Sequence, residues 1–296
     1  MTDRILELAE QGARLRVHLK ALEVERAGFP SLRVPLEDLA VLVVSHPDTL
    51  LTAPVLSEIA MAGGSVVVCD GKHLPQAMLL PLATHFTQGE RFRMQAAAKA
   101  PLLKRLWQQI IQAKIKAQGA LLARTHGVDQ GLSLLWRKVR SGDPENLEAQ
   151  AARRYWTALF DDAGFRRNRE AQDQNRYLNY GYAVLRAMAA RSLCASGLHP
   201  ALGLHHHNRY DPFALADDLM EPFRPFMDEV VLRIVRTYGG GVEMTKELRA
   251  ELLSVCHRRV LVEGEDRSLG DSMTRSAQSL AASLAGTRKR LTFPEP

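Results

Sequence analysis

The chain has 296 residues, of which 46% are hydrophobic and 24% charged, a composition that indicates a globular protein and excludes a disordered one. Lys and Arg outnumber Asp and Glu by 39 to 33, a net charge of +6. The N-terminus lacks the apolar core of a signal peptide and the longest apolar runs are too short to cross a bilayer, so we expect a cytoplasmic protein without a membrane partner.

The first 75 or so residues carry strand patterns. Alternating apolar and polar positions predict a strand over residues 14–26, and LRVPLEDLAVLVVS predicts one or two more, the later part buried on both faces. TAPVLSEIAMAGG predicts a short helix, because Pro54 suits an early helical position and two glycines end the segment. SVVVCD predicts another buried strand.

From about residue 88 the pattern changes to the period of amphipathic helices. Asp143 is a good N-cap and Pro144 suits the first helical position of the segment that follows. Pro222 and Pro225 each remove a backbone donor and predict a kink within a later helix. We predict helices over residues 89–100, 101–125, 129–140, 144–162, 174–196, 213–238, 245–263 and 268–285.

The predicted fold class is α+β and mostly α, with a small β-rich N-terminal domain joined to a larger all-α C-terminal domain. The expected parts are a β-rich domain at 1–75, a linker at 76–88, a helical domain at 89–286, and a basic, extended or mobile tail at 287–296.

The basic excess is local to the middle third of the chain. Residues 90–180 contain 17 basic and 9 acidic side chains, whereas the remainder contains 22 and 24. Clusters such as WRKVR (136–140) and GFRRNRE (164–170) indicate a surface for a polyanion. A solvated helical face is the alternative, and it explains scattered charges better than clusters.

Three successive histidines, His205, His206 and His207, precede a predicted helix that carries acidic side chains. They cannot all face one way, so at most two can serve one site. Histidines of no function in a surface loop are the alternative.

Acidic residues on two predicted helices are candidates for a cation site. Asp218 and Glu221 share a helix face beside an apolar stripe, where a carboxylate pair is costly to bury unless it binds a positive group. Asp217 is expected to turn outward. Glu148 shares a face with Tyr155, and it is either paired with an arginine or a metal ligand. Carboxylates with one imidazole suit Mg²⁺ or Mn²⁺ better than zinc and favour phosphodiester chemistry.

The segments GDPENLEAQAARRYW, LNYGYAVLRAMAARSLCASGLHPALGLHH and FALADDLMEPFRP together resemble the CRISPR-associated integrase, the catalytic subunit of the spacer-acquisition complex. VLVVSHPDTLLTAPVLSEIAMAGGSVVVCDGKHLPQAMLLPL resembles that family's β-domain and the linker after it. The resemblance spans nearly the whole chain in order. ADDLMEPFRP looks most like the subtype found beside a single large RNA-guided effector nuclease.

The resemblance implies that one Glu, one His and one further acid hold a catalytic divalent ion, Mg²⁺ or Mn²⁺. Carried over by motif, these residues are Glu148, His206 and Glu221, with Asp218 as a candidate additional acid. His206 follows the Gly-apolar-x-His pattern, and His205 is the alternative one position away.

The implied reaction is transesterification, in which a 3′-hydroxyl of a captured duplex attacks a phosphodiester of the repeat array. Metal-dependent nuclease activity at the same site is also implied. Tyr177, Tyr180 and Tyr182 could stack on bases, although we favour core positions for at least two of them. The basic side chains that could track phosphates are Lys138, Arg140, Arg166, Arg167, Arg169 and Arg176.

The resemblance further implies partners: double-stranded DNA, a second copy paired through the β-rich domain, a small ferredoxin-like subunit, and the effector nuclease as a candidate. A metal-dependent structure-specific nuclease of repair or recombination is one alternative. A non-catalytic basic DNA-binding scaffold is another, and it predicts that Glu148 and Glu221 pair with arginines. The repeat, the protospacer-adjacent motif and the choice between the two metals stay open.

Overall fold

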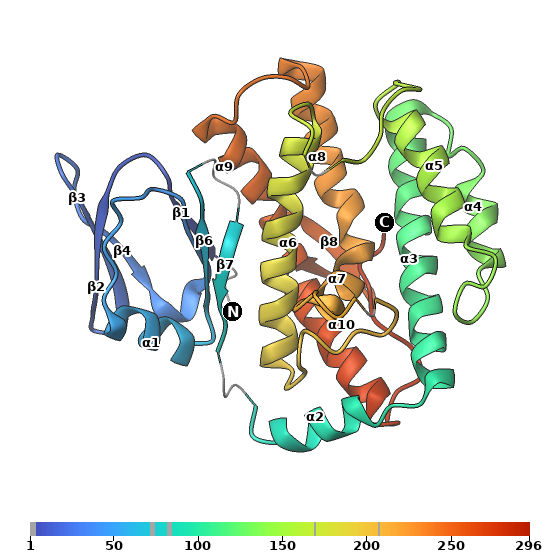
Figure 1. The fold of residues 1–296 in the computed structure, drawn as a ribbon, viewed down its shortest axis with the longest axis horizontal. Helices are drawn as coiled ribbons and strands as arrows, with labels where there is room; N and C mark the ends of the chain where they lie inside the picture. Colours follow the sequence, from blue (N-terminus) through green and yellow to red (C-terminus); the bar gives the residue numbers. More distant parts are fainter. Residues whose placement is uncertain (1–3, 72–74, 82–84, 169, 207) are drawn as a thin grey trace.

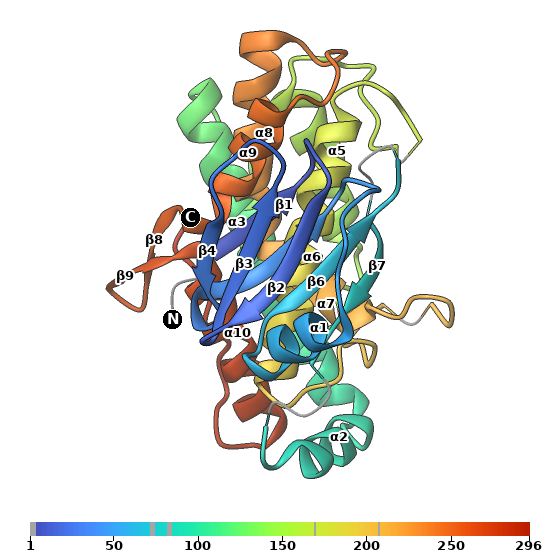
Figure 2. The same ribbon diagram turned by 90° about the vertical axis from the view of Figure 1, so that its left-hand side faces the viewer.

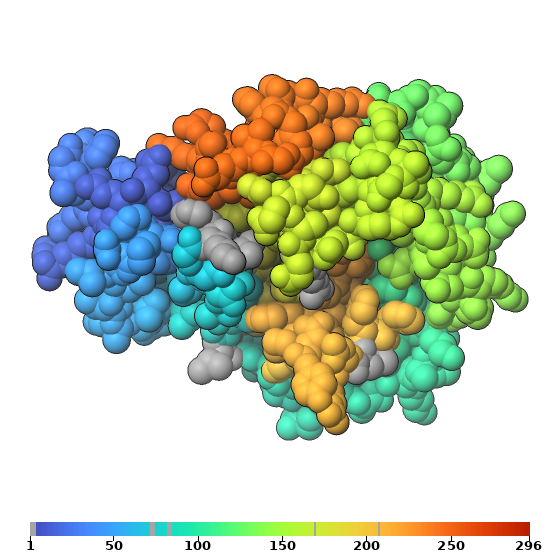
Figure 3. All heavy atoms as spheres, turned by 45° about the horizontal axis from the view of Figure 1, so that its top comes forward, coloured from blue at the N-terminus to red at the C-terminus, as the bar shows by residue number. Residues whose placement is uncertain are grey.

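A computed structural model of the protein describes residues 4–71, 75–81, 85–168, 170–206 and 208–296. The N-terminal region holds two sheets and helix α1 (Ala53–Met61) at one end of an elongated molecule (Figure 1; blue in Figure 3). The larger region is helical (Figures 1 and 2), so the predicted α+β, mostly α fold class is confirmed.

The first sheet is mixed and the second antiparallel. In the order β1-β5-β6-β7, the first two pairs are parallel and the last is antiparallel. Its strands are β1 (Arg4–Leu8), β5 (Leu39–Val44), β6 (Ser65–Cys69) and β7 (Pro75–Leu79). The second sheet consists of β2 (Ala13–His18), β3 (Ala21–Arg26) and β4 (Leu32–Pro35), and η1 (Leu36–Asp38) leads from it into β5.

The predicted strand over residues 14–26 is a hairpin. β2 and β3 are joined at Leu19 and Lys20, whose φ angles of 49° and 57° are those of a two-residue turn with left-handed backbone. The turn lacks glycine and asparagine, and the alternation of apolar residues continues through it. Nothing in the sequence pattern therefore marks the reversal.

Strand β5 joins two hydrophobic cores. Leu42 and Val44 face the core between the two sheets, whereas Val41 and Val43 face the core shared with the helices. Successive side chains of a strand point to opposite faces, so one strand serves both cores. The prediction that this strand is buried on both faces is confirmed.

Helix α6 runs through the middle of the helical region (Figure 1) and packs against α7, α8, α10 and the first sheet. The helices are α2 (Gln88–Ala96), α3 (Ala100–His126), α4 (Leu132–Leu135), α5 (Leu147–Leu159), α6 (Asn175–Ala195), α7 (Ala214–Met220), α8 (Arg224–Tyr238), α9 (Lys246–Ser254) and α10 (Leu269–Leu284). Short 3₁₀ helices are η2 (Trp136–Lys138), η3 (Glu221–Phe223) and η4 (Val255–His257). No helix in these described ranges is long and apolar enough to span a membrane.

Two helix predictions need correction. The segment 245–263 ends its helical part at η4, and β8 (Arg259–Val262) pairs with β9 (Glu265–Ser268) across a tight turn at Glu263 and Gly264, so the region is not all-α. The predicted helix over 129–140 is only the short pair α4 and η2.

The predicted kink within 213–238 is confirmed, because the helix divides at Pro222 into α7, η3 and α8. Helix α5 begins three residues later than predicted. Its N-cap is Asn146, and Asp143 accepts hydrogen bonds from the backbone N–H groups of Leu147 and Glu148 at 2.9 Å each. Asp143 thus supports the first turn from the preceding loop.

The tail at 287–296 was expected to be extended or mobile; it has no helix or strand, and it is packed against the helical region. Thr292 is buried, its N–H donates to Ser279 Oγ, and Ser276 Oγ donates to its carbonyl. Phe293 packs against the helical core.

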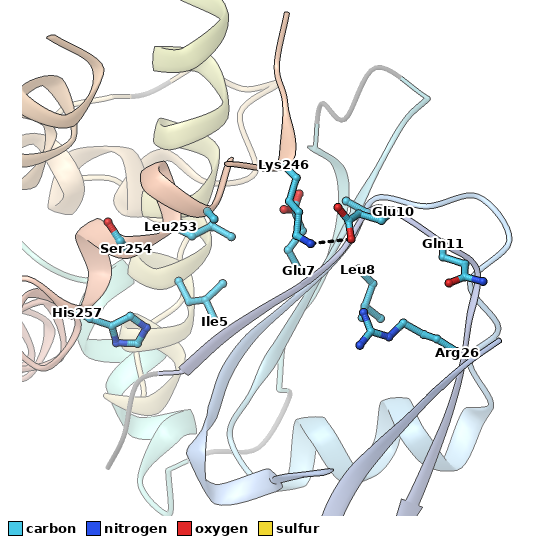
Figure 4. Close-up of a pocket in the computed structure, with 12 residues that line it drawn as sticks. Ile5, Glu7, Leu8, Glu10, Gln11, Arg26, Lys246, Leu253, Ser254 and His257 are labelled. Carbon is cyan, nitrogen blue, oxygen red and sulfur yellow. Dashed lines mark hydrogen bonds and ion pairs between the residues drawn. The ribbon is translucent and has the colours of Figure 1, made fainter. Parts of the chain in front are cut away.

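Polar contacts also cross the junction between sheet and helices. Arg249 Nε lies 2.9 Å from Glu7 Oε1, and the hydroxyl of Tyr180 donates to the same oxygen. A cavity of about 390 Å³ borders β1 and α9 there, with Glu10 and Lys246 paired at 2.8 Å (Figure 4). None of its lining residues is a predicted site residue.

Candidate metal-binding and DNA-binding site

Glu148 and Glu221 meet around one cation, the ammonium of Lys114. Glu148 lies in the first turn of α5, Glu221 begins η3, and Lys114 comes from the middle of α3. Nζ lies 2.6 Å from Glu148 Oε1 and 2.6 Å from Glu221 Oε2. Only 11% of the lysine side chain and 4% of the Glu221 side chain are exposed, so the contact is largely shielded from water. Burial disfavours the charge on Lys114, but Glu221 and Glu148 outweigh it and raise the pKa of the ammonium.

Glu221 has a second cationic neighbour in Arg224, whose Nη2 lies 3.0 Å from Oε1. Burial would raise the pKa of Glu221, but Arg224 and Lys114 outweigh that effect and hold the pKa below its ordinary value. Oε2 is buried and has ion-pair contact with Lys114 but no hydrogen bond of good geometry in the described chain. This oxygen is therefore held by charge alone.

Asp218 orients His206. The carboxylate is fully buried, and His206 Nδ1 lies 2.5 Å from its Oδ1. Its Oδ2 accepts hydrogen bonds from the backbone N–H groups of Leu204 and His205, at 2.6 and 3.1 Å. The bond to Asp218 raises the pKa of His206 against the effect of burial, and Asp218, Glu221 and Glu148 add to the rise. Both oxygens of Asp218 are thus engaged in holding the loop and the imidazole.

The histidine loop is tight, and Gly203 permits it. A Cβ at this position would lie 2.5 Å from the carbonyl oxygen of His206 and 3.2 Å from Asp218 Oδ2. Any side chain there would push the loop away from the carboxylate that anchors it.

His205 and His206 have different surroundings. The ring of His205 is stacked on Trp107 of α3, with centroids 4.4 Å apart and planes 2° apart, and the residue is exposed. His206 meets the same indole edge-on at 5.6 Å. His207 lies outside the described residues. Of His205 and His206, only His206 contacts the carboxylate of Asp218 through its ring.

Asp217 was expected to turn outward, and this expectation is wrong. The residue is buried, and its two carboxylate oxygens accept from Nε and Nη2 of Arg186 at 2.6 Å each. A fork-shaped guanidinium makes such burial tolerable, because both oxygens are paired.

The predicted DNA-contacting side chains fall into two groups. Lys138, Arg140 and Arg166 are exposed, with Arg140 paired to Glu145. Arg167 and Arg176 are half-buried: Arg167 donates to the side-chain oxygens of Asn175 and Asn179, and Arg176 donates to backbone carbonyls at the surface. Arg169 lies outside the described residues. The segment 164–176 and the loop after residue 203 lie on one face of the molecule (Figure 3, yellow-green and gold).

An arginine-lined pocket of about 420 Å³ is bordered by Met220 and Arg224. Arg167 and Arg224 approach the ring of Tyr182 at 5.2 and 4.6 Å, and Arg186 lines the same space. Nε of Arg224 is buried and has no hydrogen-bond partner in the described part of the chain. Its charges are partly balanced, because Glu170 also lines it and Arg186 and Arg224 are paired with Asp217 and Glu221.

The three candidate stacking tyrosines are all buried, which confirms core positions for them. Tyr182 donates to Asp228 Oδ1, and Tyr155 donates to its Oδ2. These two hydrogen bonds join α5 and α6 to α8.

The donor set fits a hard divalent cation, although its geometry is not that of a formed metal site. Within the described residues, no three His, Cys, Asp or Glu side chains converge closely enough to hold a metal ion. Two carboxylates nevertheless already share one cation, and the Nδ1 bond of His206 leaves its Nε2 available as a ligand.

Two residues of α3 were missed from the sequence, Trp107 and Lys114. They lie seven apart and therefore on one helix face. Lys114 and Gln118 are polar residues at spacings otherwise occupied by buried Ile111 and Leu121. A lysine within an apolar stripe was the signal that could have identified it.

The chain is similar to known proteins over most of its length. Residues 6–254 match the family described as CRISPR associated protein Cas1. A protein of Neisseria meningitidis serogroup C named CRISPR-associated endonuclease Cas1 is 38% identical over 299 residues, covering 100% of this chain and 97% of that protein. One from Thermus thermophilus, named CRISPR-associated endonuclease Cas1 1, is 30% identical over 97% of this chain and 98% of its own.

Solved structures share the fold at low identity. A Cas1 protein from Thermotoga maritima has a TM-score of 0.75 at 16% identity, covering 96% of this chain and 97% of its own. A structure titled "Casposase bound to integration product" has a TM-score of 0.77 at 18% identity, covering 98% and 92%. With a family match over most of its length and a relative 38% identical end to end, the chain belongs to the Cas1 family of CRISPR-associated endonucleases.

Proposed function

We propose that this chain is a divalent-metal-dependent DNA endonuclease and integrase. It inserts short foreign duplexes into a CRISPR repeat array by transesterification from a 3′-hydroxyl. The single observation that carries the proposal is the pair of half-buried Glu148 and buried Glu221, which share one cation beside His206. Buried carboxylates facing each other are costly unless a cation lies between them.

In this proposal Glu148, His206 and Glu221 would hold Mg²⁺ or Mn²⁺, which when bound supplies a Lewis acid for the phosphoryl oxygen and lowers the pKa of the attacking hydroxyl. Asp218 fixes the imidazole, and Arg224 keeps Glu221 ionised. The scaffold alternative predicts arginine partners for both glutamates. Glu221 has one, whereas the cation at Glu148 is a lysine shared with Glu221.

The reaction is balanced without an external energy source. A bond forms between the attacking 3′-oxygen and phosphorus as the bond to the strand's own 3′-oxygen breaks. The proton lost by the attacking hydroxyl equals the one gained by the leaving group. Water in place of the hydroxyl gives cleavage by the same in-line displacement, which accounts for an endonuclease activity.

The positive surface supports a DNA substrate. Exposed Lys138, Arg140 and Arg166 suit phosphates at the surface. Arg167, Arg186 and Arg224 line a pocket, and Arg224 is also the ion-pair partner of Glu221. Contacts of this kind bind a backbone without reading bases, as capture of arbitrary sequence requires.

The assembly is also a proposal. We infer a homodimer joined through the β-rich region, and two such dimers bridged by a small ferredoxin-like subunit. A structure titled "Cas6-RT-Cas1--Cas2 complex" shares this fold over 97% of the present chain at 18% identity. The effector nuclease is a further proposed partner.

The test is a joining assay with separate substrates. A labelled duplex with free 3′-hydroxyl ends is incubated with a repeat-bearing supercoiled plasmid, the protein, the small subunit and Mg²⁺ or Mn²⁺. Glu148→Gln, His206→Ala and Glu221→Gln should each lower joining at least about 100-fold while duplex binding is kept. Glu145→Gln is the matched control, because Glu145 is exposed three residues before Glu148. Cleavage without joining would favour a plain nuclease, and full activity in chelator would contradict the proposed metal dependence.

A further inference from the structure

We propose that Lys114 is a movable internal cation that holds the two carboxylates together until a divalent ion displaces its ammonium to a second position at Gln118. The inference rests on the proposed metal-dependent function and names the residue of this chain that sets its metal affinity.

The first argument is steric and electrostatic. The ammonium lies 2.6 Å from an oxygen of each glutamate, so it fills the space between Glu148 Oε1 and Glu221 Oε2. A divalent ion that used both oxygens could not be accommodated together with it. Without any cation there, the buried carboxylate of Glu221 and the half-buried carboxylate of Glu148 would face each other, which disfavours the folded protein. Lys114 therefore stabilises the metal-free protein and competes with the metal.

The second argument is an acceptor that has no donor. Gln118 follows Lys114 by four residues on α3, so the two side chains are neighbours on one helix face. Gln118 is buried, and its Oε1 has no hydrogen-bond partner in the described ranges. A buried carbonyl oxygen without a donor is costly, and an ammonium on a flexible stem can satisfy it. The structure thus contains a receiving position one turn from the bridging position.

The two contacts of the ammonium differ in hydrogen-bond geometry. The contact to Glu221 Oε2 is an ion pair without good hydrogen-bond geometry, whereas Glu148 Oε1 accepts a hydrogen bond from Nζ. A doubly charged ion makes a stronger contact with both carboxylates than a single ammonium can. Exchange of one cation for the other keeps the carboxylates compensated at every stage.

Two substitutions should move metal affinity in opposite directions. Lys114→Met removes the competing charge at similar length, and Gln118→Leu removes the receiving acceptor. We expect Mn²⁺ to bind about tenfold tighter to the first and about tenfold weaker to the second, measured on the full chain by calorimetry or by the spin resonance of free Mn²⁺. Lys116→Met is the control, because Lys116 is exposed on the same helix, and it should leave the affinity unchanged.

Thermal unfolding gives an independent readout. Lys114→Met should unfold at a lower temperature than the wild type in chelator and gain more from saturating Mn²⁺, since its carboxylates have lost their only shared cation in the described structure. An unchanged or weaker Mn²⁺ affinity in this variant would overturn the proposal.

A second measurement needs no substitution at Lys114 and applies even if Lys114→Met fails to fold. The wild-type protein is acylated with and without Mn²⁺, and modification of each lysine is followed by mass spectrometry. We expect Mn²⁺ to increase the labelling rate of Lys114 severalfold and to leave Lys116 unaffected. If Mn²⁺ binds and DNA is joined but labelling and affinity do not respond, this inference alone is wrong. If the wild type binds no divalent ion, the proposed function is wrong with it.

Discussion

The imidazole of His206 can act as a ligand only in one of its two neutral forms. Its Nδ1 faces a carboxylate oxygen of Asp218, which can only accept, so the proton of the neutral ring belongs on Nδ1 and the lone pair on Nε2. Asp218 was a candidate additional ligand. Its oxygens are instead occupied by His206 and by two backbone N–H groups, so its contribution is to set the form of the imidazole.

Asp218→Asn should therefore weaken joining while leaving the loop in place. The amide oxygen can still accept from Leu204 and His205, but the NH₂ group would face Nδ1 and shift the ring proton to Nε2. We expect joining to fall about 10- to 100-fold and the unfolding temperature to change little, with the ring form read from imidazole ¹⁵N shifts. Asp266→Asn is the control, since Asp266 is an exposed carboxylate that pairs with Arg259. Wild-type joining by Asp218→Asn would contradict this role.

At the scale of elements, Asp228 of α8 holds two neighbouring helices. It accepts hydrogen bonds from Tyr155 of α5 and Tyr182 of α6, and it faces Arg224 and Arg167. Burial raises the pKa of Asp228 from 3.8 to about 6, against the opposing effect of the two tyrosine hydroxyls and the two arginines. Glu148 and Tyr155 share α5, so this junction also positions the site.

The raised pKa makes the stability of this junction depend on pH. Between the ordinary value of 3.8 and about 6, the unfolded chain has released the proton and the folded protein has kept it. The contribution of Asp228 to the free energy of unfolding is thus complete below pH 4 and is lost as pH rises through 6. Relative to Asp228→Asn, the wild type should lose on the order of 2–3 kcal/mol of unfolding free energy between pH 4 and pH 7, measured by denaturant titration. A difference that is constant over this range would show that Asp228 is ionised throughout.

Sequence patterns predicted most helices and strands, but they placed some element boundaries wrongly where contacts with distant segments determine the backbone conformation. The alternation of RVLV is short and follows a helical period directly, so β8 was merged into the helix before it. Pro144 indicated a helix start, yet the chain turns once more at Asn146, where the φ of 52° is possible because asparagine tolerates left-handed backbone.

The site shows the same division. Glu148, His206 and Glu221 were proposed from motifs in single segments, and the structure brings Glu148 and Glu221 onto one lysine. Lys114 could not be assigned in that way, because it lies 34 residues before Glu148 and its partners are set by how α3 packs against α5 and η3. An ion pair between two distant segments cannot be predicted from the sequence pattern of either segment alone.

At the scale of the whole molecule, the described part of one chain carries one set of candidate ligands, whereas the proposed reaction joins two 3′-hydroxyls of a duplex. That reaction would need two copies, and we predict a dimer of 33.0 kDa chains joined through the β-rich region. Phe29 and Met61, 59% and 78% exposed, are apolar surface residues of that region. Phe29→Glu with Met61→Glu should reduce the mass in light scattering from that of a dimer to that of a monomer.

Val128→Glu with Leu134→Glu is the matched control for the dimer. These positions are similarly exposed, at 56% and 62%, but they belong to the helical region. A wild-type protein that is monomeric at micromolar concentration and still joins both ends of a duplex would rule the dimer out.

The packing of both faces of β5 has a consequence for the length of DNA that the proposed dimer would insert. Its alternate side chains are locked into the core between the sheets and the core of the helices, and Arg249 and Tyr180 contact Glu7 across the same junction. The β-rich region is therefore a rigid arm and not a tethered one. In a dimer joined through two such arms, the distance between the reacting centres would be a property of the protein fold, and the inserts would share one length whatever their sequence.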